Sequence, residues 1–306
     1  MGRFILRRVM HGAVVVFLVS VVVFVVTRLI GDPVQVMLPL EATEEQRAAF
    51  AAQLGFDRSI LAQFVDYIGD AIRLDFGNSL WQDRPAMEIV FEHLPRTLFL
   101  VLASILIAVL LAIPIGIFAA LRPGSVADRL TTSSSLVGLS IPNFWLGMML
   151  ILLFSVRLGW FPTSGSGSLK HLVLPAVTFA LPATARIAMM VRSSMIDELN
   201  KPYVQMARAK NLARTRVIGL HAFKNASVPV MTLSGWELIR ALAGFSVVVE
   251  TVFAYPGLGL LAIQSINRQD LILLQSIVFI VALMIVIVNV AMDIAYKGVD
   301  PRIKLA

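Results

Sequence analysis

The chain contains long stretches without a charged side chain, and these stretches strongly limit the folds that it can adopt. Residues 9–27, 97–121 and 130–156 contain no Asp, Glu, Lys or Arg. A helix of about 20 apolar residues is long enough to cross the hydrocarbon core of a bilayer. In a chain of 306 residues that is 58% hydrophobic and 15% charged, such runs indicate an all-α integral membrane protein.

Three further stretches also have membrane length, which predicts six transmembrane helices. They are residues 172–191, interrupted by Arg186, residues 228–249, which contain Glu237 and Arg240, and the charge-free residues 271–292. Proline lacks the backbone N–H that a helix interior uses, so prolines in these stretches are expected to bend or break their helices. They are Pro114, Pro142, Pro175 and Pro182.

Positive charge is distributed unevenly about the predicted helices. Lys and Arg cluster at the amino terminus, between the second and third helices, between the fourth and fifth, and at the carboxyl terminus. Cytoplasmic loops carry such an excess, so both termini are predicted to be cytoplasmic. This pattern also accounts for the net charge of +7 without a nucleic-acid partner.

The segment 32–95, on the opposite side, has eleven acidic residues against four arginines and is predicted to fold as an external cap. Thr43 followed by Gln46 has the form of a capping box, and Gly55 is a plausible helix stop. A second cap helix is predicted over residues 59–74.

Catalytic and metal-binding patterns do not occur in the sequence. It has no phosphate-binding loop, no nucleophile elbow and no zinc-protease helix, and it contains no cysteine. Its four histidines are far apart. We therefore expect no enzyme activity, catalytic residue or metal site, so that uphill transport would draw energy from a partner or from an ion gradient.

The basic segment 203–232 lies between two predicted membrane helices. Its pattern predicts a helix-turn-helix that couples the membrane helices to a cytoplasmic partner. Asp197 and Glu198 are expected near the amino end of its first helix, 202–212, with Arg208 and Lys210 near its carboxyl end, an order that suits the helix dipole. Small residues would keep this helix narrow enough for a groove; they are Ala207, Ala209 and Ala213. Alternatively, the segment is a solvated loop whose charges only set topology.

Several short motifs, in order along the chain, resemble those of permeases of binding-protein-dependent ABC importers. The main one is Tyr203-x-x-x-Ala207-Arg208-Ala209-Lys210, followed by His221-Ala222-x-Lys224-Asn225-Ala226, which resembles the EAA loop of that family. The sequence resembles most the first permease subunit of the dipeptide, oligopeptide and nickel group. Supporting stretches are Gly31-Asp32-Pro33, Leu54-Gly55, Asp75-Phe76-Gly77, Ile141-Pro142-Asn143-Phe144, Phe253-Ala254-Tyr255-Pro256-Gly257-Leu258-Gly259 and Asp300-Pro301-Arg302.

The resemblance implies a type I importer fold in a bacterial inner membrane. It implies a second homologous permease, two cytoplasmic ABC ATPases and an external substrate-binding protein as partners, with ATP and Mg bound by the ATPases and no cofactor in this chain. The implied organisation is a tail and first helix over 1–31, the external cap over 32–95, a permease core over 96–297 with a coupling loop at about 193–227, and a cytoplasmic tail over 298–306.

Two functional segments are expected, the first of them from the resemblance. One is the ATPase-coupling loop, with Tyr203, Ala207, Arg208, Ala209, Lys210, Asn211 and Leu212. The family has glycine where this chain has Asn211, and asparagine is the next most tolerant residue for a left-handed conformation. The other is a turn after the fifth helix, with Tyr255, Pro256, Gly257 and Gly259, which is either a re-entrant turn near an external gate or an ordinary external turn.

Charges inside the predicted fifth helix permit two interpretations. Glu237 and Arg240 are three residues apart and share a helix face, where they would either line a translocation path or form a packed, self-neutralising pair. Arg186 is expected to extend toward the cytoplasm.

Di- or oligopeptides are the predicted cargo, with a nickel chelate or glutathione as the alternative. An ion-coupled secondary transporter that uses Glu237, Arg240 and Asp293, and a membrane scaffold without transport activity, remain as alternatives from other classes. Six helices without an inverted repeat weigh against the secondary transporter.

Overall fold

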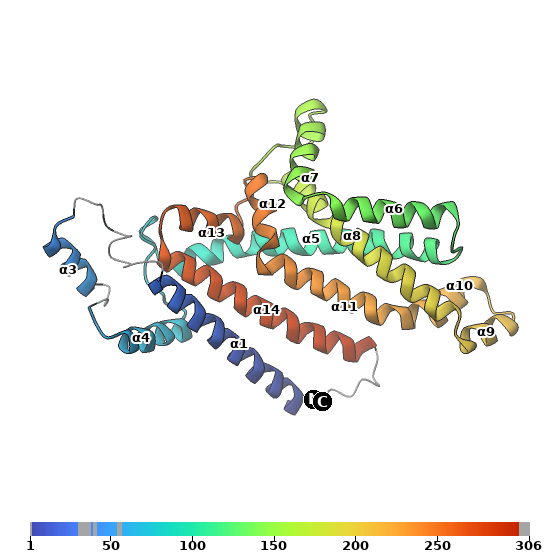
Figure 1. Ribbon diagram of the computed structural model, residues 1–306, viewed down its shortest axis with the longest axis horizontal. Helices are drawn as coiled ribbons and strands as arrows, with labels where there is room; N and C mark the ends of the chain where they lie inside the picture. Colours follow the sequence, from blue (N-terminus) through green and yellow to red (C-terminus); the bar gives the residue numbers. More distant parts are fainter. Residues whose placement is uncertain (1, 30–37, 39–41, 54–56, 300–306) are drawn as a thin grey trace. The chain divides into compact units, whose positions relative to one another are not determined.

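The computed structural model describes residues 2–29, 38, 42–53 and 57–299, and Figure 1 shows that they are almost entirely helical. The chain divides into two compact units, residues 1–96 with 256–287 and residues 97–255 with 288–306. Some sequence motifs lie outside the described residues. They are Gly31-Asp32-Pro33, Leu54-Gly55, which includes the predicted helix stop, and Asp300-Pro301-Arg302.

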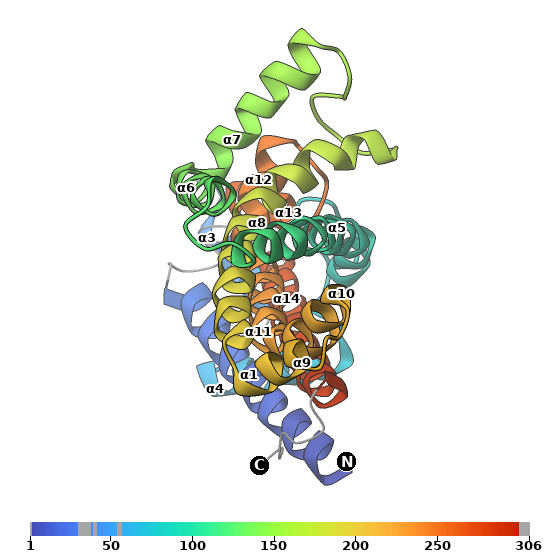
Figure 2. The same ribbon diagram turned by 90° about the vertical axis from the view of Figure 1, so that its right-hand side faces the viewer.

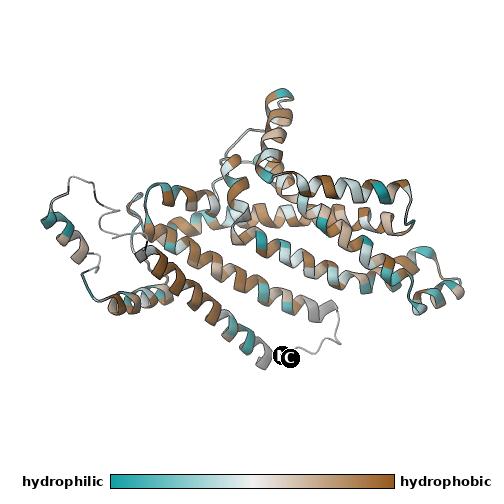
Figure 3. Cartoon of the chain, in the orientation of Figure 1, coloured by the Kyte–Doolittle hydropathy of each residue, from teal (hydrophilic) through white to brown (hydrophobic). Residues whose placement is uncertain are grey.

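Four continuous helices within the described residues are long and apolar enough to cross a membrane, and Figure 3 shows hydrophobic residues along them. They are α1 (Gly2–Leu29), α5 (Ala86–Ala120), α8 (Leu169–Leu199) and α14 (Leu271–Val299). Two bent helix pairs add one span each if each pair crosses once. The chain is therefore a helical membrane protein with four to six candidate spans, and the predicted six is the upper value.

The first bent pair breaks at Pro142. Helix α6 (Val126–Ser140) and α7 (Asn143–Leu150), which continues into the π-helix η1 (Ile151–Arg157), meet at 100°. Because the residue before a proline disfavours the helical region, Ile141 is extended and the helix ends. The prediction for Pro142 is confirmed. By contrast, α5 and α8 continue unbroken past Pro114, Pro175 and Pro182, so at these prolines only a bend remains a prediction.

The second bent pair breaks at Gly244, which the sequence did not predict. Helix α11 (Lys224–Arg240) runs into the short π-helix η3 (Ala241–Phe245), and α12 (Ser246–Val252) then leaves at 58°. Gly244 has φ of 127°, a conformation that residues with a Cβ rarely adopt.

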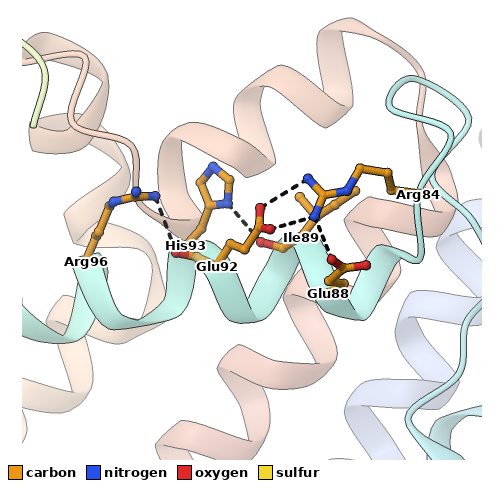
Figure 4. Close-up of polar contacts among 6 residues, drawn as sticks. All are labelled: Arg84, Glu88, Ile89, Glu92, His93 and Arg96. Atoms are coloured by element: carbon orange, nitrogen blue, oxygen red, sulfur yellow. Dashed lines mark hydrogen bonds and ion pairs between the residues drawn. The ribbon is translucent and has the colours of Figure 1, made fainter.

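In the first unit, α5 begins at Ala86, ahead of the apolar stretch that starts at residue 97. Figure 4 shows the ion pairs of its polar first turns: Arg84 lies beside Glu88 and Glu92, with Nη2 2.8 Å from Glu88 Oε1 and 2.5 Å from Glu92 Oε1. Carboxylates in the first turns of a helix also interact favourably with its dipole. Arg96 donates to the Glu92 carbonyl oxygen, and His93 Nδ1 lies 2.8 Å from the Ile89 carbonyl oxygen.

The helices that precede α5 are capped as the sequence predicts. At the start of α3 (Glu44–Gln53), the Thr43 N–H donates to Gln46 Oε1 at 2.9 Å, and the Gln46 N–H donates to Thr43 Oγ1 at 3.3 Å. Helix α4 (Ile60–Arg73) is capped by Ser59 and ends at Leu74, which is left-handed. The capping box and the helix over 59–74 are both confirmed.

The core of the first unit forms where α13 (Leu258–Asn267) and α14 pack on the start of α5, through Ile89, Val90, Leu261, Leu273 and Ile277. Asp270 attaches the loop that precedes α5 to this core. It accepts from the Ser79 hydroxyl at 2.5 Å and from the Leu273 N–H at 3.0 Å, so it also caps α14.

In the second unit, α8 packs against both α6 and α11, as Figures 1 and 2 show. Small residues permit close approach: a Cβ added at Gly116 on α5 would lie 2.6 Å from the Ala188 carbonyl oxygen of α8. After α8 the chain forms α9 (Pro202–Ala209), α10 (Arg214–Arg216) and the π-helix η2 (Val217–Phe223), which leads into α11.

Candidate functional site

The predicted coupling helix corresponds to α9, which begins with Pro202 at its first position. Lys210 ends the helix, and Asn211 follows with φ of 56°. The Leu212 N–H then donates to the Ala207 carbonyl oxygen at 3.3 Å. The prediction of a left-handed Asn211 is confirmed, because its φ lies in the region that glycine and asparagine tolerate best.

One face of α9 packs into the second unit. Val204 is fully buried, and Ala207 is only 4% exposed in a core cluster that includes Val217 and Ala222. Ala207 thus faces inward, and a large side chain there would disrupt the core rather than a docking surface. The small Ala207 does not narrow an exposed helix; it lets α9 lie close to η2.

The opposite face of α9 is exposed and carries the large apolar side chain of Met206, which the sequence motif did not single out. Met206 is 60% exposed. Exposed basic residues precede and follow Met206 in the sequence; they are Lys201, Arg208, Lys210, Arg214, Arg216 and Lys224. We call this the α9 surface: Met206 with these six basic residues. Figure 2 shows α9 and α10 at the end of the second unit that faces the viewer.

Tyr203 holds the start of α9 between two other helices. Its hydroxyl donates to the Glu198 carboxylate of α8 and accepts from Asn225 Nδ2 of α11 at 2.7 Å. Burial, and then the hydrogen bond to Glu198, raise the pKa of Tyr203 above its ordinary value, so the phenol stays a donor. Any displacement of α9 would act on α8 and α11 through this side chain.

Asp197 and Glu198 lie at the carboxyl end of α8 and not on the coupling helix. They still lie near the amino end of α9, as predicted, because the Glu198 carboxylate accepts a hydrogen bond from the hydroxyl of Tyr203 in the first turn of that helix. Arg208 does lie in the last turn of α9, as predicted.

Glu237 and Arg240 share a face of α11, but Glu237 bonds mainly to Arg186 of α8. Arg186 Nη2 donates to Glu237 Oε2 at 2.8 Å, and Nε donates to Oε1, which makes the contact bidentate. Arg240 Nη1 lies farther away, 3.6 Å from Oε1. Arg186 is thus an ion-pair partner within the helix bundle, and the prediction that it extends to the cytoplasm was wrong. We call these three residues the α8–α11 charge cluster.

Two more buried carboxylates were missed because their partners are distant in sequence. Asp128, in the first turn of α6, accepts from Arg192 of α8, with Nη2 to Oδ2 at 2.8 Å, and from the Gly124 N–H at 2.8 Å. Glu250, in α12, accepts from the Thr97 hydroxyl of α5 at 2.8 Å. A charged residue near the end of an apolar stretch was the available signal, although it does not identify the partner.

The predicted gate turn is shorter than the sequence suggested. Within the second unit, Ala254 has φ of 43°, and the Tyr255 N–H donates to the Glu250 carbonyl oxygen at 2.8 Å. Within the first unit, Gly257 is the N-cap of α13, and Gly259 already lies inside that helix. Placing Gly259 in a turn was wrong; a gating role for these residues stays a prediction.

Among the described residues there is no group of three or more His, Asp or Glu side chains that could hold a metal ion. The described side chains of the α9 surface and the α8–α11 charge cluster suit protein contacts and charge pairing. We assign them no covalent chemistry.

Comparison with protein families gives two matches that cover most of the chain. The family described as "Binding-protein-dependent transport system inner membrane component" matches residues 112–305, and its N-terminal companion family matches residues 1–101. These matches cover the coupling loop, the charge cluster and the segments that precede α5.

Two curated proteins are similar over their full lengths. The oligopeptide transport system permease protein AppB of Bacillus subtilis (strain 168) is 36% identical over 316 residues, covering 99% of this chain and all of the relative (100%). The glutathione transport system permease protein GsiC of Escherichia coli (strain K12) is 35% identical over 305 residues, covering 99% of each.

Solved structures share the fold. An inward-facing structure of the MetNI methionine ABC transporter has a TM-score of 0.58 at 18% identity, covering 70% of this chain and 97% of that one. An amino acid ABC transporter with histidines has a TM-score of 0.54 at 17% identity, covering 69% and 94%. The architecture is that of type I ABC importer permeases.

Proposed function

Because the chain belongs to the family of binding-protein-dependent transport system inner membrane components, and is an ABC importer permease, we propose that its cargo is di- or oligopeptides. An external binding protein delivers them. The oligopeptide permease of B. subtilis and the glutathione permease of E. coli support a small peptide-like cargo. Glutathione or a nickel chelate is the alternative within the family.

Uptake measurements discriminate between these cargoes. The chain is reconstituted with its companion permease, ATPases and binding protein, and uptake of labelled dipeptides, oligopeptides, glutathione and a nickel chelate is compared. ATP-dependent uptake of several peptides is the expected result, whereas uptake of glutathione or the nickel chelate alone would replace the proposed cargo. ATP-independent uptake driven by an ion gradient would instead favour a secondary transporter.

The α9 surface is proposed to dock on one of two cytoplasmic ATPases. The observation that carries this proposal is the division of α9 into an inner face fixed by Val204 and Ala207 and an outer face that carries the exposed Met206. A flexible thioether can fill an irregular apolar groove, and the basic residues around it suit an acidic rim. The second homologous permease would place an equivalent helix on the other ATPase.

Alternating access would follow from motion of α9. Closure of the ATPases on ATP would draw the two coupling helices together, and the Tyr203 hydrogen bonds would carry that motion into α8 and α11. This is a shift of population between inward-open and outward-open states. Tyr255, Pro256 and Gly257 are proposed to form part of the external gate.

The docking proposal is tested by changing the outer face of α9 without touching its core. Met206→Asp should reduce ATPase association and transport while leaving membrane insertion intact. Val126→Asp is a matched control, because Val126 is also an exposed apolar residue (73%), lies on the same predicted side, and accepts an aspartate at a helix start. Unchanged transport in Met206→Asp would refute docking through this face.

The proposed orientation, with both termini cytoplasmic, is tested by cysteine labelling in this cysteine-free chain. Glu45→Cys on α3 should react with an impermeant reagent from outside intact cells, and Thr215→Cys on α10 should react only after permeabilisation. The reverse pattern would invert the topology.

A further inference from the structure

Helix α4 has an apolar surface that is much wider than its contact with the rest of the first unit requires. At about 100° per residue, its side chains fall into three sectors. One sector, with Phe64, Tyr67 and Ala71, faces α1 or is buried. A second sector is polar, with Gln63, Asp66, Asp70 and Arg73.

The third sector is apolar and exposed. Leu61, Val65 and Ile72 lie within about 40° of one another around the helix axis. They are 73%, 62% and 79% exposed. This sector adjoins the packed one, so the apolar surface of α4 covers about half of its circumference and only part of it contacts protein. Figure 3 shows hydrophobic residues along both α4 and α1.

The contact between α4 and α1 places α4 at a definite depth along a membrane-spanning helix. The Phe64 ring lies 5.2 Å from the Phe24 ring and 6.2 Å from the Phe17 ring, and Tyr67 lies 5.6 Å from Phe24, measured between centroids. The candidate span within α1 ends at Thr27. At 1.5 Å per residue, Phe24 is about 5 Å and Phe17 about 15 Å inside that end.

The same depth is reached on α14. Tyr67 packs on Phe76, with ring centroids 5.8 Å apart, and Phe76 packs on Phe279 of α14 at 5.4 Å. Phe279 is eight residues, or about 12 Å, beyond Leu271, where α14 begins. An aromatic ladder therefore anchors α4 beside two spans, inside their ends.

We infer that α4 is an interfacial helix that lies in the membrane leaflet at the carboxyl end of α1, with Leu61, Val65 and Ile72 buried among lipid acyl chains. Amphipathic helices of this kind sit about 5–10 Å into the headgroup and acyl boundary. The contact of Phe64 with Phe24, about 5 Å inside the end of the α1 span, lies in this range, and its contact with Phe17 reaches deeper. The open face of α1 is also apolar, with Leu18 and Val22 exposed, so the lipid-facing surface continues from one helix to the other.

Lipid is favoured over a protein partner because the polar sector remains available to the headgroup region and to water. Arg58 pairs with Asp66 on that side, next to the carboxylate of Asp70. A soluble partner docked on Leu61, Val65 and Ile72 would have to enter the leaflet at the depth of Phe24. The inference does not depend on the cargo or on ATPase docking.

Site-directed spin labelling tests it in the complete transporter, reconstituted in phosphatidylethanolamine and phosphatidylglycerol vesicles. Single cysteines are introduced at Val65 and Ile72 and, as matched neighbours in the polar sector, at Asp66 and Arg73. Leu18→Cys on α1 is the lipid reference, and Glu45→Cys on α3 is the aqueous reference. Collision of each nitroxide with oxygen, which concentrates in lipid, is compared with collision with a water-soluble nickel chelate.

The expected result is a several-fold higher ratio of oxygen to nickel collisions at Val65→Cys and Ile72→Cys than at Asp66→Cys and Arg73→Cys, with the first pair close to Leu18→Cys. Nickel-dominated collision at residues 65 and 72, matching Glu45→Cys, would show an aqueous surface and overturn the inference. Low collision with both reagents, relieved when the binding protein or companion permease is omitted, would show a protein contact and overturn it as well.

Discussion

The two units of this permease use the same ion-pair chemistry in different surroundings. In the first unit, Arg84 binds Glu88 and Glu92 at the start of α5, where the carboxylate side chains are 56% and 48% exposed. In the second unit, the carboxylates of Glu237 and Asp128, paired with arginines of α8, are 4% and 6% exposed. Distance alone does not separate them, since contacts of 2.8 Å occur in both units.

The exposed and the buried pairs differ in what the loss of one partner costs. An exposed pair exchanges water for a partner at little gain, so Arg84 mainly orders the first turns of α5. A buried carboxylate cannot recover its solvation if its partner is lost. Arg186 is therefore needed to keep α11 packed on α8, and Arg192 to keep α6 packed on α8. The low exposure of the Asp128 and Glu237 carboxylates therefore predicts that loss of the paired α8 arginine weakens the packing of α8 on α6 or α11.

The largest effect is expected at Arg186. Arg186→Met removes the bidentate partner of Glu237 and should lower the free energy of unfolding by on the order of 3 kcal/mol, because Arg240 alone compensates the buried charge poorly. The yield of assembled complex and its thermal midpoint in detergent measure this loss. Arg157→Met, at an exposed arginine, is the control.

The double variant Arg186→Met, Glu237→Leu separates packing from transport. If the pair is structural, removing both charges restores yield and peptide uptake; if the cluster lines the path, yield recovers while uptake or peptide range changes. Normal uptake across several peptides would end the idea that the cluster contacts cargo. A single variant as stable as the parent would contradict the comparison itself.

An intermediate effect is expected at Arg192. Its loss leaves Asp128 with the Gly124 N–H as one remaining donor, so Arg192→Met should cost about 2 kcal/mol. Exchanging the charges, Asp128→Arg with Arg192→Asp, should recover part of the stability but not the Gly124 bond. Equal melting of Arg192→Met and Arg157→Met would show that this pair does not hold α6 to α8.

Local signals in the sequence predicted the parts of the fold that depend on a few neighbouring residues. The Thr43–Gln46 capping box, the helix capped by Ser59, the break at Pro142 and the left-handed Asn211 all follow from side chains within four positions. The motif around Tyr203 likewise located α9.

Long-range placement could not be predicted in this way. Arg186 and Glu237 are 51 residues apart, and Arg192 and Asp128 are 64 apart, so no spacing rule joins them. The inward position of Ala207 and the exposure of Met206 also depend on η2, which packs on only one side of α9. Gly244 was missed because a lone glycine in an apolar stretch fits an ordinary span equally well.

The smallest effect is expected at Arg84, and its dependence on salt gives the sharpest test of the comparison. Hydrogen bonds to Glu92 and then Glu88 raise the pKa of Arg84, so the guanidinium stays charged at any pH used for transport. Arg84→Met should lower the thermal midpoint least of the three single variants, because exposed pairs are weak. Raising the ionic strength from about 0.1 to 1 M shortens the screening length from about 10 to 3 Å, so this small cost should fade. The cost of Arg186→Met should persist under the same salt, because the side chain of Glu237 is only 4% exposed and buried pairs are screened much less. Thermal midpoints of both variants and the parent at the two salt concentrations measure this contrast. A salt-independent loss at Arg84, as large as that at Arg186, would mean that the start of α5 is covered in the assembled transporter and that exposure in the isolated chain misjudges it.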